Sequence, residues 1–306
     1  TRLPTTKMSM ADLKTEFSFS GHGKHFVKLL QLRKEGKVHY VKELEVNTLL
    51  TLNNTKDYVH AGDNSDIIPT DSQKNIVYIL AKQYGIQNIE KFALLLSDHF
   101  LRKYKHVANT KIYIEEAPWK RISMVCVCFS KGYFKEYKSL RSFYDHNSLT
   151  NHVHAFVLSK EAKRRCEVTQ AQGCSPKLRS GIADFKIMKT TQSAFKNFVD
   201  DEFRTLPDTD DRLYCTCVDS WCPSQVFDYN FHFFVREGIK GIILDTFAGP
   251  ATTGVFSASI QSTIYLTERN VLSTIPQVHF ISNLHTYLFY TNNFHIFVKI
   301  IQLLCN

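Results

Sequence analysis

A change of periodicity at Pro69 constrains the fold of this chain more than any other feature of its sequence. From Phe17 to Val46, ahead of this proline, the pattern predicts two strands joined by a tight turn, with one face formed by Val38, Tyr40, Leu44 and Val46. After it, Thr70 and Gln73 have the spacing of a capping box, with Thr70 as the expected N-cap. Apolar residues then recur at helical spacing, at Ile76, Val77, Ile79 and Leu80. We therefore expect a β-hairpin followed by a helix.

The start of this helix has two open interpretations. Its free backbone N–H groups and the positive end of the helix dipole suit a small anion. Alternatively, Thr70 only caps the helix, as most capping residues do.

The segments that follow predict an α+β fold. Asn88 is the expected cap of a second helix, whose apolar residues recur at Ile89, Phe92, Ala93, Leu96 and Phe100. Extended segments follow at 107–119 and 152–158. A hairpin, two helices and two strands form an antiparallel β-sheet with helices packed on one face.

The second half of the chain predicts a similar unit. We expect strands at 165–170, 183–190 and 210–218, a short helix at 193–199, and longer helices at 231–247 and 257–273. The predicted organisation is a mobile lead at 1–16, a first unit at 17–160 with an insert at 123–151, and a second unit at 161–306. A length of 306 residues is consistent with two units.

Composition narrows the class of protein. The sequence has no apolar run long enough to cross a membrane and no signal-peptide pattern, which predicts a soluble intracellular protein without a membrane partner. Its 8 cysteines have irregular spacing and are expected to be reduced thiols. The net charge of +9 fits a nucleic-acid partner or an anionic small molecule, and charge alone does not separate the two.

Three stretches carry a resemblance to a known family. They are KELEV at 42–46, GDNSDIIPTDSQKN at 62–75 and EEAPWKRI at 115–122. Together they resemble urate oxidase (uricase), and the similarity extends over residues 17–122 and 152–276. The resemblance implies two tandem T-fold (tunnelling-fold) units. It also implies a cofactor-free oxidase that converts urate and dioxygen to 5-hydroxyisourate and hydrogen peroxide.

The resemblance assigns the chemical step to three residues. Lys24 matches the lysine of the family motif Tyr-Gly-Lys, in which His22 replaces the tyrosine here, and is the expected base. Thr70 relays the proton through its hydroxyl group. His285 orients this relay and assists the later addition of water. By residue type alone, Lys24 would be a solvated lysine on a strand.

The resemblance also implies the residues that hold urate, a flat anion. Arg212 would form two parallel hydrogen bonds with one edge of the purine, where the sequence alone suggests a surface ion pair. Ile260 and Gln261 would contact a second edge, and Phe195 would stack on the ring. The remaining contacts fall to the backbone N–H of Asp71 and to Asn283, which would hold dioxygen or water above the purine.

In the family, Lys24 and Thr70 belong to one subunit and the Arg212 group to its neighbour. We therefore expect a homotetramer with its sites between subunits. The family is peroxisomal, but the chain ends in Leu304-Cys305-Asn306 instead of a Ser-Lys-Leu type tripeptide, and a cytoplasmic location is expected if this end is genuine.

Two segments depart from the family. The insert 123–151 is rich in basic and aromatic residues, and three interpretations are open: a surface excursion, a mispredicted exon or a single-stranded nucleic-acid site. After Pro276 only Asn283-Leu284-His285 matches the family.

We expect no metal ion, because His152-x-His154 and Cys215-x-Cys217 lack a second pair at ligand spacing, and the resemblance implies no other cofactor. The functions weighed are therefore an active urate oxidase, a catalytically impaired T-fold homo-oligomer, and a basic nucleic-acid-binding protein. The resemblance favours the first of these and an assembly without nucleic acid.

Overall fold

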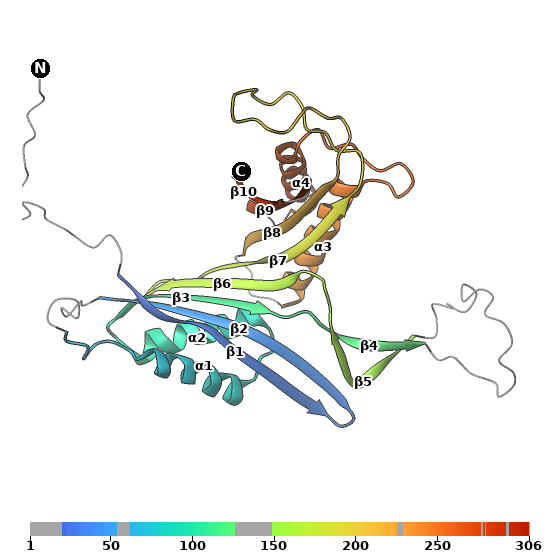
Figure 1. Cartoon of the computed structure of the whole chain (residues 1–306). Coiled ribbons are helices and arrows are strands. Elements are labelled where there is room, and N and C mark those ends of the chain that lie inside the picture. Colours follow the sequence, from blue (N-terminus) through green and yellow to red (C-terminus); the bar gives the residue numbers. More distant parts are fainter. Residues whose placement is uncertain are drawn as a thin grey trace, which may run out of the picture.

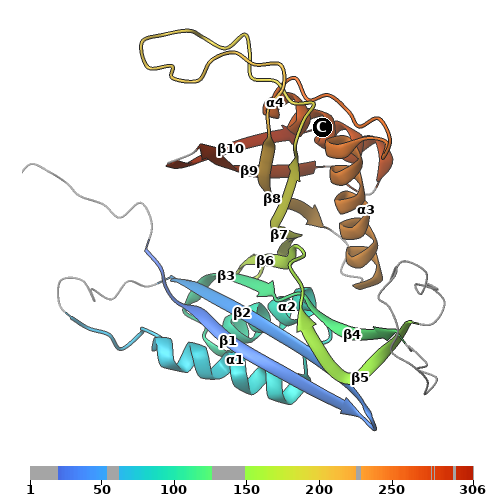
Figure 2. The ribbon, with the colours of Figure 1, turned by 45° about the vertical axis from the view of Figure 1, so that its right-hand side comes forward.

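The computed structural model describes residues 20–53, 62–125, 149–224, 229–276, 278, 280–291 and 294–305. Within these ranges the main element is an 8-stranded antiparallel sheet in the order β1-β2-β3-β6-β7-β8-β9-β10 (Figure 1). β1 and β10 are the edges of this sheet. The other two strands, β4 and β5, pair with each other in a ribbon beside it (Figures 1 and 2). The predicted α+β class is confirmed.

Apart from β4 and β5, which lie between β3 and β6 in the chain, the two halves contain the same elements in the same order, namely a hairpin, two helices and two strands. The first half contains β1 (His22–Glu35), β2 (Val38–Leu52), α1 (Thr70–Tyr84), α2 (Ile89–Lys103), β3 (Val107–Glu116) and β6 (Lys163–Ala171). The second contains β7 (Lys177–Lys189), β8 (Tyr214–Ser224), α3 (Tyr229–Ala248), α4 (Ile260–Thr274), β9 (Phe280–Thr291) and β10 (Phe294–Cys305). The ribbon is formed by β4 (Trp119–Val125) and β5 (Leu149–Leu158).

The predicted hairpin is confirmed, with Gly36 in its turn at φ +59°. Leu44 and Val46 of β2 are buried, whereas Tyr40 on the same strand is 39% exposed. The difference arises because β3 pairs with β2 only from Leu44 onward, so the tip of the hairpin extends past the sheet.

Four of the predicted helices are confirmed, and the first of them is α1, which begins at Thr70 as expected. Asn88 caps α2, where its side chain accepts a hydrogen bond from the Lys91 N–H at 2.6 Å. Ser259 caps α4 in the same way, accepting from the Ser262 N–H at 3.1 Å. The remaining helix, α3, covers and slightly exceeds the predicted range 231–247.

Three expectations about strands and helices are corrected. The segment 152–158, expected as a strand of the first unit's sheet, pairs with β4 in the ribbon instead, and β6 is the strand that pairs with β3. The segment 193–199 is not a helix, because Ser193 and Phe195 form isolated bridges with Ser257 and Thr209. β8 begins at Tyr214, later than the predicted residue 210. Residues 126–148 of the insert lie outside the described part, and its ends belong to β4 and β5.

The helices of both halves pack on one face of the sheet. A first core lies between α1, α2 and the strands β1, β2, β3 and β6, and a second core between α3, α4 and the strands β7, β8 and β9. Leu178 belongs to the first core and Ile182 to the second. Because these residues are four apart on β7, their side chains point to the same face.

The two hairpins share an unusual local structure. In the first, a bulge follows Lys24, Phe26 adopts φ +57°, and its N–H donates to the Asn47 side chain at 2.7 Å. In the second, a bulge follows Ile182, Asp184 adopts φ +57°, and its N–H donates to the Asp219 side chain at 2.9 Å. We propose that β1–β2 and β7–β8 are equivalent parts of two repeated units.

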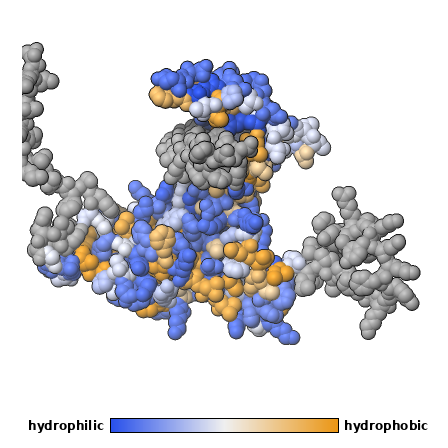
Figure 3. All heavy atoms as spheres, in the orientation of Figure 1, coloured by the Kyte–Doolittle hydropathy of each residue, from blue (hydrophilic) through white to orange (hydrophobic). Residues whose placement is uncertain are grey.

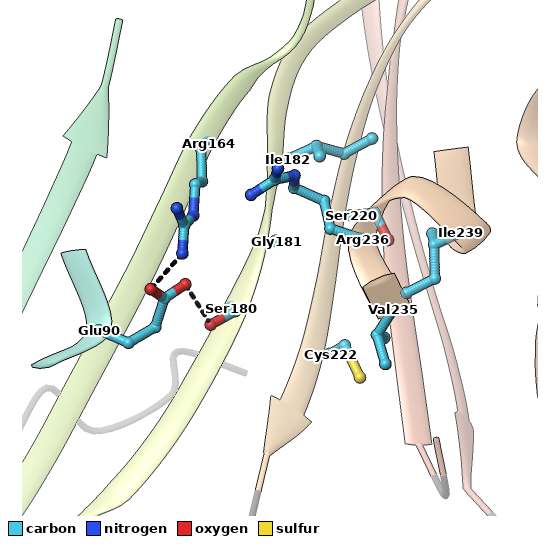
Figure 4. A pocket seen from close by; sticks show the side chains of 10 residues that line it. All are labelled: Glu90, Arg164, Ser180, Gly181, Ile182, Ser220, Cys222, Val235, Arg236 and Ile239. Atoms are coloured by element: carbon cyan, nitrogen blue, oxygen red, sulfur yellow. Dashed lines mark hydrogen bonds and ion pairs between the residues drawn. The ribbon is translucent and has the colours of Figure 1, made fainter. Parts of the chain in front are cut away.

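A buried ion pair lies where the two halves meet. Glu90 of α2 binds Arg164 of β6 and accepts a hydrogen bond from the Ser180 hydroxyl of β7 at 3.1 Å (Figure 4). The side chains of Glu90 and Arg164 are 3% and 11% exposed. This pair and an adjacent cavity of about 30 Å³ lie beside α3, because Val235 and Ile239 line the opposite wall.

Candidate active site

Lys24 lies on β1 directly opposite Thr48 of β2. The strands approach closely here, since a Cβ atom on Gly23 would lie 1.9 Å from the carbonyl oxygen of Thr48. The Lys24 N–H donates to the Thr48 hydroxyl oxygen at 3.3 Å, ahead of the bulge described above. The backbone of Lys24 is therefore held by its strand pairing with Thr48 and by the hydrogen bond from its N–H to the Thr48 hydroxyl.

The predicted capping box at Thr70 is wrong. α1 begins at Thr70, but Pro69 occupies the N-cap position and no side chain caps the helix. Gln73 is fully buried, where it accepts a hydrogen bond from the Thr48 hydroxyl at 2.8 Å and donates one to the Ile68 carbonyl at 3.2 Å. A bond across the core has replaced the local bond of a capping box, and Thr70 remains exposed at the helix start.

Asp71 follows Thr70 and is also exposed. Its carboxylate binds Lys74 at 2.7 Å and accepts from the Asn75 amide at 3.1 Å. The bond from Lys74 is the main cause that lowers the pKa of Asp71, and Lys24 adds a smaller effect. Because the first N–H groups of an α-helix have no acceptor within it, the Asp71 N–H suits the predicted contact with an anion.

His22, at the position of the family tyrosine, lies beside the backbone of Ile68 and near His106. Burial is the main cause that lowers the pKa of His22, and its Nε2 atom has no hydrogen-bond partner among the described residues. His106 contacts the Asp66 carbonyl at 2.9 Å. Two imidazoles therefore adjoin the segment that leads to Thr70.

Phe195 and Arg212 come together in the second half. The guanidinium group of Arg212 lies 5.1 Å from the centroid of the Phe195 ring. The Arg212 N–H donates to the Ser193 carbonyl at 2.9 Å, which joins its segment to that of Phe195. Phe198 stacks on Phe195 with ring centroids 4.7 Å apart.

The start of α4, with Ile260 and the exposed Gln261, belongs to the same region. Ser257 pairs with Ser193 through an isolated parallel bridge. Lys189, at the end of β7, donates to the carbonyl groups of Phe247 and Val255 at 3.1 and 2.9 Å, and to the Ser257 hydroxyl at 2.7 Å. Burial lowers the pKa of Lys189. This lysine was missed in the sequence, because its acceptors are distant along the chain.

Asn283 and His285 lie on β9, where the backbone ladder pairs them with Ser220 and Val218 of β8. Only their backbone positions are described. The ladder shows that both residues belong to the second half of the sheet.

The structure does not bring the two groups of site residues together within one chain. Lys24 pairs with Thr48, and the ladder continues through Ile112, Val168 and Leu178 to Ser224 at the end of β8. Five strand intervals separate β1 from β8, about 24 Å along the sheet. Arg212 precedes the opposite end of β8, a strand of 11 residues that spans about 35 Å. A single urate molecule cannot contact both groups of one chain.

Other parts of the described structure add no ligand group to this site. No cluster of three or more His, Cys, Asp or Glu side chains suitable for a metal ion occurs among the described residues. His152 accepts hydrogen bonds from the N–H groups of His154 and Ala155 through its Nδ1 atom, and Cys215 and Cys222 are buried. The cavity of Figure 4 contains none of the predicted site residues. No described helix is long and apolar enough to span a membrane.

Comparison with solved structures defines the class. The chain has the fold of Arthrobacter globiformis uricase, with a TM-score of 0.74 over 96% of both chains at 23% identity. A structure of a Bacillus sp. TB-90 urate oxidase mutant gives a TM-score of 0.72 at 18% identity, covering 94% of this chain and 100% of that one. The molecule is a T-fold protein, as predicted.

Sequence comparison then defines the family. The family model described as Uricase matches residues 20–169 and 178–290, a range that includes Asn283-Leu284-His285. The uricase of Drosophila pseudoobscura pseudoobscura is 43% identical over 299 residues, 94% of this chain and 85% of that protein. The uricase of Oryctolagus cuniculus is 39% identical over 266 residues, which cover 86% of this chain and 80% of that protein. The chain belongs to the uricase family.

Proposed function

We propose that this protein oxidises urate with dioxygen to 5-hydroxyisourate and hydrogen peroxide, without a metal ion or organic cofactor. Membership of the uricase family supports the reaction. Within the chain, the observation that carries the proposal is the Arg212 guanidinium group, 5.1 Å from the Phe195 ring beside the start of α4. A planar cation and an aromatic ring at this separation suit a flat anion.

Urate is held by complementary contacts. Its ring replaces Phe198 as the stacking partner of Phe195, and Arg212 donates two parallel hydrogen bonds to one edge. Gln261, next to Ile260, pairs with an amide-like edge, because a glutamine side chain both donates and accepts. The Asp71 N–H, at the start of α1 in a second copy of the chain, donates to a urate oxygen.

The reaction begins with the removal of a second proton from urate. Lys24 acts as the base through the Thr70 hydroxyl, which passes the proton on. The resulting dianion gives two electrons to dioxygen, which takes up two protons and leaves as hydrogen peroxide. Asn283 holds dioxygen, and later water, above the purine. His285 orients the water whose oxygen forms the new C–O bond at the oxidised ring, so that urate, dioxygen and water balance 5-hydroxyisourate and hydrogen peroxide.

The site is completed by self-association, as a homotetramer with urate bound between copies. The separation of Lys24 from Arg212 along and across the sheet supports this arrangement. So does β1, an edge strand on which Phe26, Leu30 and Leu32 are 71%, 62% and 49% exposed. Figure 3 shows hydrophobic patches on the lower part of the molecule, where Figure 1 places β1. By family resemblance, the location is peroxisomal.

The test is loss of the urate ultraviolet absorbance together with release of hydrogen peroxide, in metal-free buffer. The activity is expected to persist in excess EDTA. Loss with EDTA and recovery with zinc would refute the cofactor-free mechanism. A correctly assembled oligomer that leaves urate unchanged would instead favour a catalytically impaired member of the family.

A further inference from the structure

Two buried polar side chains, Thr48 and Gln73, connect the strand of Lys24 to the helix of Thr70. They are 1% and 0% exposed, in the first core between β2 and α1. The Thr48 hydroxyl oxygen lies 2.8 Å from Gln73 Oε1 and 3.4 Å from the Lys24 carbonyl oxygen. Because a hydroxyl group has one proton, the shorter contact identifies Gln73 as its acceptor. The Thr48 hydroxyl oxygen in turn accepts a hydrogen bond from the Lys24 N–H.

The connection continues through Gln73 to the backbone just before Thr70. Gln73 donates its side-chain amide to the Ile68 carbonyl and its backbone N–H to the Pro69 carbonyl at 3.1 Å. The ring of Pro69, at φ −53°, restricts the backbone between Ile68 and Thr70. The position of the Thr70 hydroxyl therefore follows the position of Gln73.

We propose that Thr48 and Gln73 are positioning residues that set the distance between Lys24 and Thr70. Neither side chain contacts urate in the proposed function, on which this inference rests. Proton transfer depends steeply on the separation of donor and acceptor, and a shift of about 1 Å can cost about a hundredfold in rate. Loss of the connection is therefore expected to slow turnover, while the Arg212 group of another copy still binds urate.

The chain offers a matched control in the same core. The Thr110 hydroxyl lies 2.7 Å from that of Ser97, which donates to Gln170 Oε1 at 2.8 Å. Thr110 is 1% exposed, like Thr48, but its bonds join α2 to β3 and β6 and involve neither Lys24 nor α1. Thr48→Val and Thr110→Val thus remove one hydroxyl each from equally buried networks.

The first experiment compares kcat, KM for urate and melting temperature in the two variants. Thr48→Val is expected to lower kcat by roughly 10- to 100-fold with KM changed by less than about threefold. Thr110→Val should lose a similar amount of melting temperature and keep its kcat. Thr48→Ser, which retains the hydroxyl, should restore most of the turnover. Equal losses of kcat in the two valine variants, or no rescue by serine, would overturn the proposal.

A second measurement does not depend on urate chemistry. Hydrogen–deuterium exchange of the peptide that covers residues 68–76 should become faster in Thr48→Val than in Thr110→Val. Gln73→Met breaks the connection from the helix side and serves as a second variant if Thr48→Val does not fold. Equal exchange in this peptide refutes the positioning role. A wild-type protein that does not oxidise urate refutes the proposed function, and leaves the exchange comparison intact.

Discussion

Lys24 on β1 and Arg212, just before β8, lie five strand intervals apart in one chain, and the ladder that starts at Lys24 reaches β8 at the end away from Arg212. If Lys24 is the base and Arg212 the substrate cation, as proposed, residues so far apart can serve one small molecule only when a second copy supplies one of them. This relationship separates their roles, and the separation is open to measurement.

Lys24→Met should reduce turnover by roughly a hundredfold or more with little change in urate affinity, because a general base acts mainly in the transition state. Arg212→Ala should instead weaken urate binding by about 2 kcal/mol or more, the cost of losing a charged bidentate contact. Steady-state kinetics and equilibrium binding of urate without dioxygen distinguish the two effects. Weakened binding with unchanged turnover in both variants would contradict these roles.

Mixed oligomers test whether the site is shared. Thr70→Ala chains at any urate concentration, and Arg212→Ala chains at low urate concentration, are expected to be nearly inactive, so the assay uses low urate. When they are refolded together in equal amounts, random association gives about a quarter of sites with both halves intact. Activity near that fraction is the expected result. If mass spectrometry confirms mixed oligomers and no activity returns, each chain carries a complete site.

Lys189→Met should disturb the second group of site residues. The substitution leaves the Phe247 and Val255 carbonyls and the Ser257 hydroxyl without their common donor, at an expected cost of about 2 kcal/mol in the free energy of unfolding. Because Ser257 adjoins Ser193, urate KM should rise more than kcat falls. Lys177→Met, on the same strand at an exposed position, is the control and should change neither quantity.

The stability of the protein should decrease in alkaline solution through the buried thiol of Cys222 and the partly buried thiol of Cys217. Burial raises the pKa of Cys222 to about 11, and burial together with Asp219 raises that of Cys217 to about 11. An unfolded chain releases these protons near pH 9, whereas the folded protein holds them until pH 11. The free energy of unfolding therefore falls as the pH rises from about 9 to 11. Urea denaturation measures this fall in the free energy of unfolding. The fall should be smaller in the double variant Cys217→Ala/Cys222→Ala than in the wild-type protein, and unchanged in Cys174→Ala.

Residues 126–148 should be dispensable for assembly. Val125 and Leu149 are paired at the end of the ribbon, so a two-residue Asn-Gly turn can connect them. Oligomer mass, melting temperature and turnover of this shortened chain are expected to match those of the full chain. A chain that remains monomeric after the replacement would show that the segment takes part in assembly.

Local patterns predicted the elements whose stability is local. The hairpin, the Asn88 cap and the helix predicted at 257–273 each depend on residues close together in the sequence, and all three are confirmed. Gln73 was misassigned because its spacing from Thr70 fits a capping box, while its actual partner, Thr48, is 25 residues away. The helix predicted at 193–199 was wrong for a related reason, since the bridges of this segment to Thr209 and Ser257 depend on distant parts of the chain.

Site residues were located through family resemblance rather than through periodicity. The structure brings Phe195 and Arg212 together, as their proposed roles require. Thr48 and Lys189 escaped notice because a threonine on a strand and a lysine at a strand end have no distinctive spacing. Their importance is visible only from the groups they contact.

The repeated bulge of the two hairpins gives a natural comparison within one molecule. Gly23 and Gly181 approach the facing strand equally closely, because a Cβ atom added to either would lie 1.9 Å from a carbonyl oxygen. These oxygens belong to Thr48 and Ser220, which correspond to each other in the two hairpins. Ile182 stands where the first half has Lys24. The bulged hairpin that presents Lys24 thus occurs twice, and in the second hairpin an aliphatic side chain takes the place of the lysine. Under the proposed function the two units divide the work: one supplies the proton acceptor, and the other keeps the same backbone frame while its loops bind the purine.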